Sequence, residues 1–346
     1  MTSVDVTVRG GGVFGLAVAW ACARRGARVR LVETARIGAG ASGGVVGALA
    51  PFAPEGWNDL KAFQLDSLLM AEGWWAQVAA AGGGDPMYLR SGRLQPLADE
   101  AAVAAARARE GAARDLWGGR ADWRVVAATG ATWEPVAASG LLVADTLTAR
   151  ISPREACAAL VAALRAAGGE VVLGEAPDAG AVVHATGWTG LADLSAAFGR
   201  KLGAAVKGQA VVLRHDAAAL PQVYAGGLHV VPHGDGTVAV GSTSETDWAV
   251  EGPDAQAEAL VARARAVMPV LAGAEVIERW AGLRPRAKSR GPVLGAWPGR
   301  PGHFVANGGF KIGFGLAPKA GEVLAEFILN NRSDIPDGFS VEALLA

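Results

Sequence analysis

Three glycines near the start of the chain have the spacing of a phosphate-binding loop. Gly10, Gly12 and Gly15 form a G-x-G-x-x-G pattern between a run of alternating valines and an apolar run. The first glycine of this pattern permits a tight turn, the second lets the backbone approach a pyrophosphate, and the third lets the following helix pack closely. Glu33 ends the next strand-like run, where a carboxylate can accept hydrogen bonds from ribose hydroxyls. These residues predict a dinucleotide site, and Glu33 disfavours a 2′-phosphate because two anions would meet.

The surrounding patterns indicate which elements position this loop. We expect a strand, a helix and a second strand over residues 4–33, and further helices over 59–80, 99–116, 152–167 and 253–268. Ser152, Pro153 and Glu155 have the spacing of a capping box with proline at the first helical position. We expect the last helix to begin near Pro318. Short buried strands occur early, in the middle and late, and alternating β patterns occur at 88–97 and 208–243. The order predicts a mixed α/β plus α+β protein, in which a Rossmann-type domain is interleaved with an antiparallel-sheet domain.

The first apolar run has a second interpretation. Residues 9–23 have the length of the apolar region of a signal peptide, but they are too short to span a membrane. A regular strand before the run and Arg24-Arg25-Gly26 after it favour a buried β-turn-α unit. We therefore expect a cytoplasmic protein with no membrane partner.

Composition excludes several classes of protein. The chain has 346 residues, 51% of them apolar, and a net charge of −1, which excludes a disordered chain and argues against a broad basic surface for nucleic acid. The two cysteines are too few for a disulfide scaffold. The five histidines lack the spacing of a zinc site, so no metal is expected.

The chain contains further short sequence motifs, and their order along the chain is more informative than any one of them alone. They lie at residues 40–42 and 47–51, at 184–188, at 207–209, at 280–285 and 292–295, and at 308–311 and 316–318. Together with the nucleotide loop, they resemble the FAD-dependent D-amino-acid oxidase superfamily, in particular its glycine oxidase and sarcosine oxidase branch. The loop alone does not separate FAD from NAD, whereas this resemblance implies FAD.

The resemblance also implies the residues of the site. Flavin and nucleotide contacts are expected from Gly10, Gly12, Val13, Gly15, Glu33, Ala41, Ser42, Gly47, Ala48, Leu49, Ala176, Ala185, Thr186, Gly187, Trp188, Gly282, Arg284, Gly308, Gly309, Phe310, Lys311 and Ile312. Arg284 is the expected anchor of a substrate carboxylate, since a guanidinium offers two parallel donors. Lys311 is a second anchor, which would hold an anion as a point charge. Pro318 would begin a helix whose positive end faces the flavin.

His229 occupies the position at which many members of the superfamily carry a tyrosine before a Val-Pro pair. It could line the pocket and titrate near neutral pH, or it could face solvent. Residues 1–85, 145–205 and 290–346 are expected to form the FAD-binding domain, and 86–144 and 206–289 the substrate domain. The sarcosine oxidase branch attaches its flavin through a cysteine late in the chain. Because no cysteine follows Cys157 here, the resemblance implies non-covalent FAD.

The implied activity is oxidation of a small amino acid or N-alkyl amino acid, with hydride transfer from Cα to flavin N5. Two alternatives stay open: an NAD-linked dehydrogenase that uses the same loop, and a flavin-binding subunit of a larger complex that passes electrons to an acceptor other than oxygen. The sequence leaves open the amino acid, its stereochemistry, the electron acceptor, and whether the chain forms a homo-oligomer.

Overall fold

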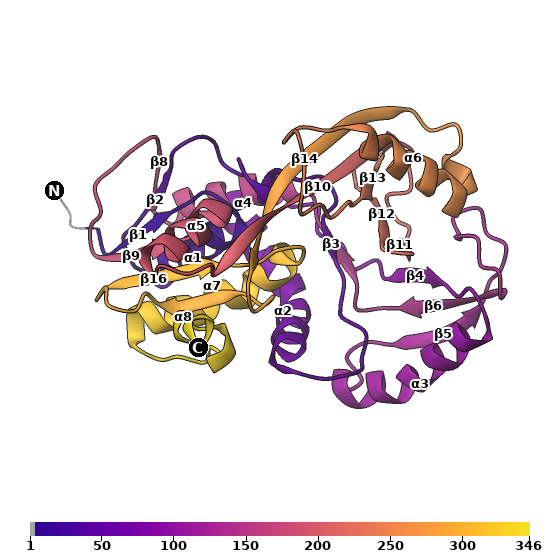
Figure 1. The fold of residues 1–346 in the computed structure, drawn as a ribbon, viewed down its shortest axis with the longest axis horizontal. Helices are drawn as coiled ribbons and strands as arrows, with labels where there is room; N and C mark the ends of the chain where they lie inside the picture. The colour runs from indigo at the N-terminus through magenta and orange to yellow at the C-terminus, as the bar shows by residue number, and fades with distance from the viewer. Residues whose placement is uncertain (1–3) are drawn as a thin grey trace.

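Two sheets carry the fold, and the chain passes between them several times (Figure 1). The computed structural model describes residues 4–346. The strands of the smaller sheet are β1 (Val6–Arg9), β2 (Val29–Glu33), β8 (Glu170–Leu173), β9 (Ala181–His184), β15 (Val293–Ala296) and β16 (His303–Asn307), in the order β15-β16-β9-β1-β2-β8. All neighbours in this sheet are parallel except β15, which is antiparallel to β16. Strands β3 (Ala48–Leu49) and β7 (Ala149–Arg150) form a separate antiparallel pair.

The larger sheet has eight strands in the order β14-β10-β13-β12-β11-β4-β6-β5. They are β4 (Arg93–Pro96), β5 (Trp123–Ala127), β6 (Leu141–Asp145), β10 (Gly203–Arg214), β11 (Gln222–Ala225), β12 (Leu228–Pro232), β13 (Thr237–Gly241) and β14 (Val276–Ala287). Helix α6 (Ala255–Val267) covers one face of β10–β13 with a core of alternating valines and leucines. Helix α3 (Glu100–Trp117) packs near β5. The opposite face of the large sheet is left to line a cavity, because side chains alternate between the two faces of a strand.

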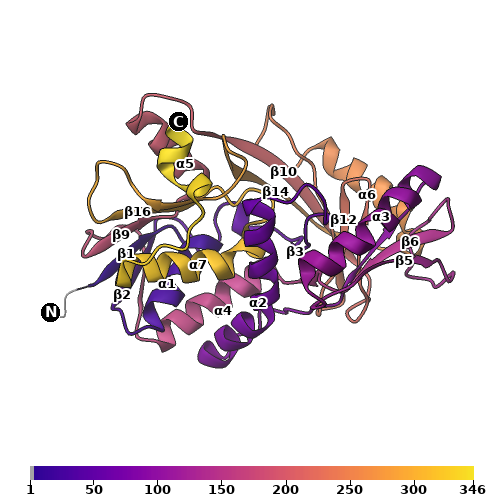
Figure 2. The ribbon, with the colours of Figure 1, turned by 90° about the horizontal axis from the view of Figure 1, so that it is seen from below.

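Helices cover the smaller sheet. They are α1 (Val13–Ala23), α2 (Asp59–Gly82), α4 (Pro153–Ala166), α5 (Gly187–Ala197), α7 (Gly313–Asn330) and the short α8 (Val341–Leu345). Figure 2 shows α1, α7, α4 and α2 gathered on one side. Every residue of α1 is buried, which explains the apolar run as a core helix. Within residues 4–346, no helix combines the length and apolar character needed to cross a bilayer.

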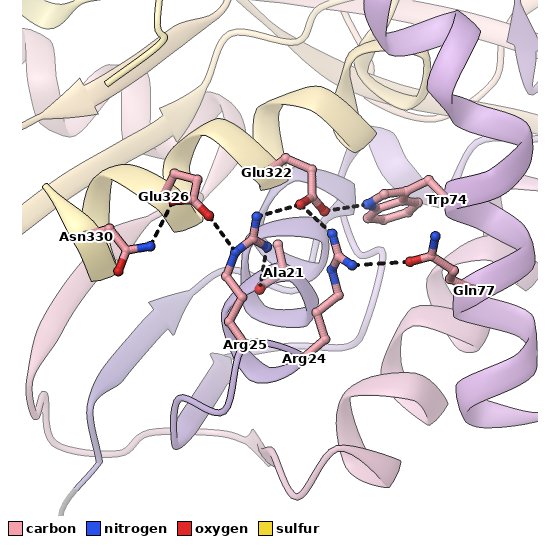
Figure 3. A network of polar contacts seen from close by, with 8 residues as sticks. All are labelled: Ala21, Arg24, Arg25, Trp74, Gln77, Glu322, Glu326 and Asn330. Carbon is pink, nitrogen blue, oxygen red and sulfur yellow. Dashed lines mark hydrogen bonds and ion pairs between the residues drawn. The ribbon is translucent and has the colours of Figure 1, made fainter. Parts of the chain in front are cut away.

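A polar network fastens the C-terminal end of α1 to its two neighbours (Figure 3). Glu322 on α7 accepts hydrogen bonds from Arg24, from Arg25 Nη2 at 2.8 Å, and from Trp74 Nε1 on α2 at 2.8 Å. Arg25 Nε also donates to Glu326 Oε1 at 3.0 Å. One carboxylate thus joins three helices at the end of α1 remote from the nucleotide loop.

The predicted mixed α/β class is confirmed, but three local predictions are wrong. Ser152 precedes α4 with no side-chain capping bond, so the capping box does not form, although Pro153 is the first helical residue. The expected strand over 88–97 is confined to β4. The last helix begins at Gly313, and Pro318 lies inside it. Packing of this glycine-rich first turn against the core outweighs its low helix propensity.

Candidate active site

A cavity of about 1250 Å³ lies between the two sheets. The smaller sheet contributes the nucleotide loop and the segments around 39–53, 185–189 and 306–314, and the larger sheet contributes residues of β4, β5, β11, β12 and β14. The predicted site residues therefore converge from both ends of the chain.

The nucleotide loop has the close contacts that its glycines predict. Gly10 has a φ of +109°, and a Cβ there would lie 2.4 Å from Ala185 O. A Cβ at Gly15 would lie 2.0 Å from Gly10 O, so Gly15 serves packing and does not line the cavity. A Cβ at Gly12 would meet only Ser42 Oγ, at 3.2 Å, which leaves the space in front of Gly12 open to the cavity.

The start of α1 is suited to an anion. Its N-cap residue Gly12 offers no side chain, and its first turn contains no acidic residue, so the positive end of the helix faces the cavity. Ser42 Oγ accepts a hydrogen bond from Val13 N at 2.9 Å, which places a hydroxyl beside this turn. Glu33 accepts from Gly11 N and Ala35 N, both at 2.8 Å, and its carboxylate is thereby held at the end of β2.

The other predicted cofactor contacts fall into two groups. Ala41, Ser42, Gly47, Ala48, Ala185, Thr186, Gly187, Trp188, Gly282, Gly308, Gly309, Phe310 and Ile312 line the cavity. Asn307 Nδ2 donates to Gly187 O at 2.8 Å and so joins two of these segments. Leu49 and Ala176 do not line it: Leu49 is buried in the core, and Ala176 O accepts a hydrogen bond from Arg9 Nη2 at 3.1 Å.

Arg284 is the strongest candidate for an anion-binding group. It lies on β14, only 7% exposed, and its Nη1 donates to Thr243 O at 3.0 Å. No ion-pair partner for it is found in the described part of the chain, residues 4–346. Burial lowers the pKa of Arg284 to about 10, and the charge of Glu245 opposes this shift. A buried cation without a bound anion at a cavity wall is an arrangement that a carboxylate ligand would complete.

The space for this guanidinium comes from the neighbouring strand. Gly208 on β10 pairs with Gly282 on β14, two residues from Arg284 and on the same face. A Cβ at Gly208 would lie 2.0 Å from Arg284 Cζ and from both terminal nitrogens. The 207–209 segment was recognised in the sequence only as part of a family pattern, and the structure gives its glycine a physical role.

A buried network on the opposite face of β10 holds the acceptor of Arg284. Lys207 is fully buried, and its Nζ lies 2.6 Å from Asp254 Oδ2 and 3.5 Å from Glu245 Oε2. Gln209 N donates to Thr243 Oγ1 at 2.8 Å, and Thr243 N donates to Gln209 O at 3.2 Å. These bonds hold the backbone at Thr243 and so fix the position of its carbonyl oxygen, which accepts from Arg284.

Lys311 lies at the exposed edge of the cavity. Its Nζ is 5.6 Å from the centroid of the Phe310 ring. Partial burial, followed by the charge of Arg284, lowers the pKa of Lys311. Arg284 and Lys311, the two predicted carboxylate anchors, therefore both place positive charge along the same cavity.

His229 lines the cavity and does not face solvent. Burial, with smaller effects from the charges of Arg93 and Lys311, lowers its pKa to about 3. The expectation that His229 titrates near neutral pH is therefore wrong, because its surroundings disfavour the imidazolium. Its ring lies 4.6 Å from that of Tyr224, centroid to centroid.

Sequence reasoning missed several residues of the cavity wall. Arg93 and Gln95 on β4, Trp123 on β5, Tyr224 on β11 and Trp280 on β14 all line the cavity. The alternation of Arg93 and Gln95 was visible in the sequence as part of a strand-like run. The pairing of β4 with β11 was not visible in the sequence. This pairing places Arg93 and Gln95 on the same face of the sheet as His229, which lies one strand beyond β11.

Comparison with known proteins assigns this arrangement to a family. Residues 5–327 match the family model described as FAD dependent oxidoreductase (DAO), and the chain belongs to this family. The predicted FAD-dependent oxidoreductase and its resemblance to the D-amino-acid oxidase superfamily are thereby confirmed.

Individual relatives are glycine oxidases. The chain is 28% identical to the glycine oxidase of Geobacillus kaustophilus strain HTA426, over 94% of this chain and 92% of that protein. It is 35% identical to the glycine oxidase of Pseudomonas putida strain KT2440, but that match spans 42% of this chain and 40% of the relative. The crystal structure of glycine oxidase from Geobacillus kaustophilus superposes with a TM-score of 0.86 at 26% identity, covering 98% of this chain and 99% of that one.

The residues present fit the FAD that the family requires. The uncapped end of α1 would hold the pyrophosphate and Glu33 the ribose, while the open space at Gly12 permits close approach of the backbone. Both cysteines are buried, neither lines the cavity, and burial raises the pKa of each thiol to about 12.

Proposed function

We propose that this chain catalyses the FAD-dependent oxidation of a small amino acid or N-alkyl amino acid at its CH–NH2 or CH–NH bond. The observation that carries the proposal is the buried Arg284 guanidinium, which reaches the cavity without an ion-pair partner among residues 4–346. The similarity to glycine oxidases over nearly the full chain supports the same substrate class.

The roles of the chain's own groups follow from their positions. Arg284 binds the substrate carboxylate through its free donors and orients Cα, while Lys311 adds a second positive charge. Bound FAD supplies the hydride acceptor at N5. His229 stays neutral at neutral pH, because burial lowers the pKa of its imidazole to about 3. The substrate amine must itself be uncharged to lose a hydride. The imine product is then hydrolysed by water.

Anaerobic titration of the purified FAD-loaded protein tests this proposal. We expect glycine, sarcosine or another small amino acid from a panel that includes D-amino acids and proline analogues to bleach the flavin absorbance. Arg284→Ala should weaken substrate binding at least about tenfold, because a charge-assisted hydrogen bond contributes about 1.5–3 kcal/mol. Arg284→Lys should recover part of this loss.

Lys288→Ala is the matched control, since Lys288 is an exposed cation on the same segment. Equal effects of the Arg284 and Lys288 substitutions would contradict the assignment of Arg284. If no amine bleaches the flavin, the proposed activity fails and a flavin-binding subunit becomes the better interpretation. Reoxidation of the bleached protein with oxygen or with an artificial acceptor then distinguishes an oxidase from a dehydrogenase.

A further inference from the structure

The cavity contains a second buried guanidinium, on a different strand from Arg284. Arg93 lies on β4 and is 5% exposed. Its Nε donates to Asp145 Oδ2 at 2.8 Å, across the β4–β6 pairing. The other oxygen of Asp145 accepts from Thr148 N at 2.8 Å. Each carboxylate oxygen therefore accepts one hydrogen bond, and the carboxylate occupies only one of the five N–H donors of the guanidinium.

The groups around Arg93 also have unused hydrogen-bonding capacity. Neither terminal nitrogen of Arg93 has a hydrogen-bond partner within residues 4–346. Gln95 Nε2, on the same face of β4, and His229 Nδ1 are both buried and without a partner. Buried polar atoms are normally hydrogen-bonded, and each one left unpaired costs about 1–3 kcal/mol. Several such atoms on one cavity wall indicate a place for a ligand.

The ring of Tyr224 lies between these groups. Its centroid is 5.7 Å from Arg93 Cζ and 4.6 Å from the centroid of His229. The pairing of Tyr224 with His229 places both on the face of the sheet that carries Arg93. We call Arg93, Gln95, Tyr224 and His229 the β4 subsite.

The β4 subsite and the Arg284 anchor are parts of one continuous basic wall. His229 is affected by the charges of both Arg93 and Lys311, and Lys311 is affected by the charge of Arg284. Arg93, His229, Lys311 and Arg284 all line the same cavity, and three of them are cations. Among the acidic residues, Glu33 at the nucleotide loop and Glu251 line the cavity, whereas Asp145, the partner of Arg93, does not. Such a wall repels an ammonium group and attracts a second anion.

We propose that the β4 subsite binds a second carboxylate of the substrate, so that the chain prefers an amino acid with two carboxylates to one with an uncharged substituent. This inference rests on the proposed function, in which Arg284 holds the first carboxylate. The terminal nitrogens of Arg93 match the two oxygens of a carboxylate, and Gln95 Nε2 supplies a further donor.

Binding of ligands that cannot be oxidised tests the subsite without relying on turnover. Diglycolate has two carboxylates and methoxyacetate has one, and both carry an ether oxygen in place of the amine. We expect diglycolate to perturb the flavin absorbance of the FAD-loaded protein with a dissociation constant at least about tenfold lower than that of methoxyacetate. Equal dissociation constants, together with equal flavin reduction by aspartate and alanine, would overturn the proposal.

Substitution of Arg93 locates the effect. Arg93→Lys keeps a cation beside Asp145, so the buried carboxylate stays paired, but it removes the planar pair of donors. We expect it to weaken diglycolate at least about tenfold and to leave methoxyacetate unchanged. Arg214→Lys, in an exposed ion pair with Glu275 on the same sheet, is the control and should alter neither ligand. Equal weakening of both ligands by Arg93→Lys would mean a purely structural role and would reject the subsite.

Oxidation measurements separate this inference from the proposed function. Anaerobic flavin reduction is compared for iminodiacetate and sarcosine, and for D- and L-aspartate against the corresponding alanines. Faster reduction by iminodiacetate places the second carboxylate on the amine substituent, and faster reduction by an aspartate places it on the side chain. If sarcosine reduces the flavin as well as iminodiacetate does and alanine as well as aspartate does, the subsite is rejected while the activity stands. If no amine reduces the flavin but diglycolate is preferred, the activity is rejected while the subsite stands.

Discussion

At the scale of single residues, the proposed carboxylate anchor Arg284 depends on Gly208, a glycine that does not line the cavity. Arg284 lies over Gly208, and a Cβ at that glycine would occupy the position of the guanidinium. The atoms that would clash are at the far end of a flexible side chain, so the side chain can move without disturbing the strands. We therefore expect the fold to tolerate a change at Gly208 that would disrupt the proposed binding of a carboxylate.

We predict that Gly208→Ala weakens substrate binding at least about tenfold while changing the free energy of unfolding by less than about 1 kcal/mol. The displaced guanidinium would lose its hydrogen bond to Thr243 O and would no longer point into the cavity. Flavin titration measures the first effect and urea unfolding the second.

A double-mutant cycle with Arg284→Ala shows whether Gly208 acts through the arginine. If it does, Gly208→Ala should have almost no effect when Arg284 is already absent. Additive losses would instead show that the added methyl group acts on the cofactor or on the strand pairing.

Which site residues could be predicted depends on how local their signal is. Gly10, Gly12, Gly15 and Glu33 lie within one β-α-β unit, so spacing alone identified them. Arg284 and Lys311 needed the resemblance to a family, because neither a single arginine in a strand nor a single lysine in a glycine-rich loop has a specific pattern. Arg93, Gln95 and Tyr224 reach the cavity only through the register of strands that are distant in the sequence, and no local pattern encodes that register.

At the scale of elements, the close approach of α1 and α7 sets the position of the nucleotide helix. Gly321 faces α1, where a Cβ would lie 2.8 Å from Ala17 O and 2.9 Å from its carbonyl carbon. Gly73 lies in α2 with no atom within 4 Å of an added Cβ. A glycine-to-alanine substitution can therefore be compared at a crowded helix position, Gly321, and at an open one, Gly73.

We predict that Gly321→Ala lowers the free energy of unfolding by about 1–3 kcal/mol, because backbone atoms block the methyl group. Gly73→Ala should raise it by about 0.5–1 kcal/mol through helix propensity. Urea unfolding of the two variants compares them directly. A stabilising Gly321→Ala would show that the helices separate easily.

At the scale of the whole molecule, buried histidines make the fold sensitive to acid. Burial lowers the pKa of His229 to about 3, and burial is also the main cause that lowers the pKa of His184, to about 4, and that of His233. An unfolded histidine takes up a proton near pH 6.5. As the pH falls below 6.5, protons therefore bind the unfolded chain first, and the folded state loses stability until the folded pKa is reached.

We predict that the free energy of unfolding falls between pH 7 and pH 5, with His229 contributing on the order of 2 kcal/mol. His229→Asn should remove that part of the dependence. Urea unfolding at the two pH values measures it. Equal losses in the parent and in His229→Asn would show that His229 is solvated in solution.

The interleaving of the two sheets was predictable in outline, because parallel α/β patterns occur at both ends of the chain with antiparallel β between them. The start of α7 was not predictable from the sequence, because Pro318 has the local pattern of a first helical residue. Close packing of α7 against α1 and α2 supports the extra turn and the proline within it. An added Cβ would lie 3.5 Å from Leu68 Cδ2 at Gly315 and 2.8 Å from Ala17 O at Gly321. Such contacts arise only when the chain is assembled.

The position of α7 has a consequence for how the protein is made. Helix α1 is buried on every side, and its main helical neighbour begins only at Gly313. At bacterial or eukaryotic elongation rates, roughly 15–60 s separate the two helices as they leave the ribosome. Strands β1 and β2 and helix α4, which also pack on α1, emerge earlier, but the side of this apolar helix that packs on α7 stays uncovered for that interval. We therefore expect the nascent chain to depend on a holdase until its final segment emerges.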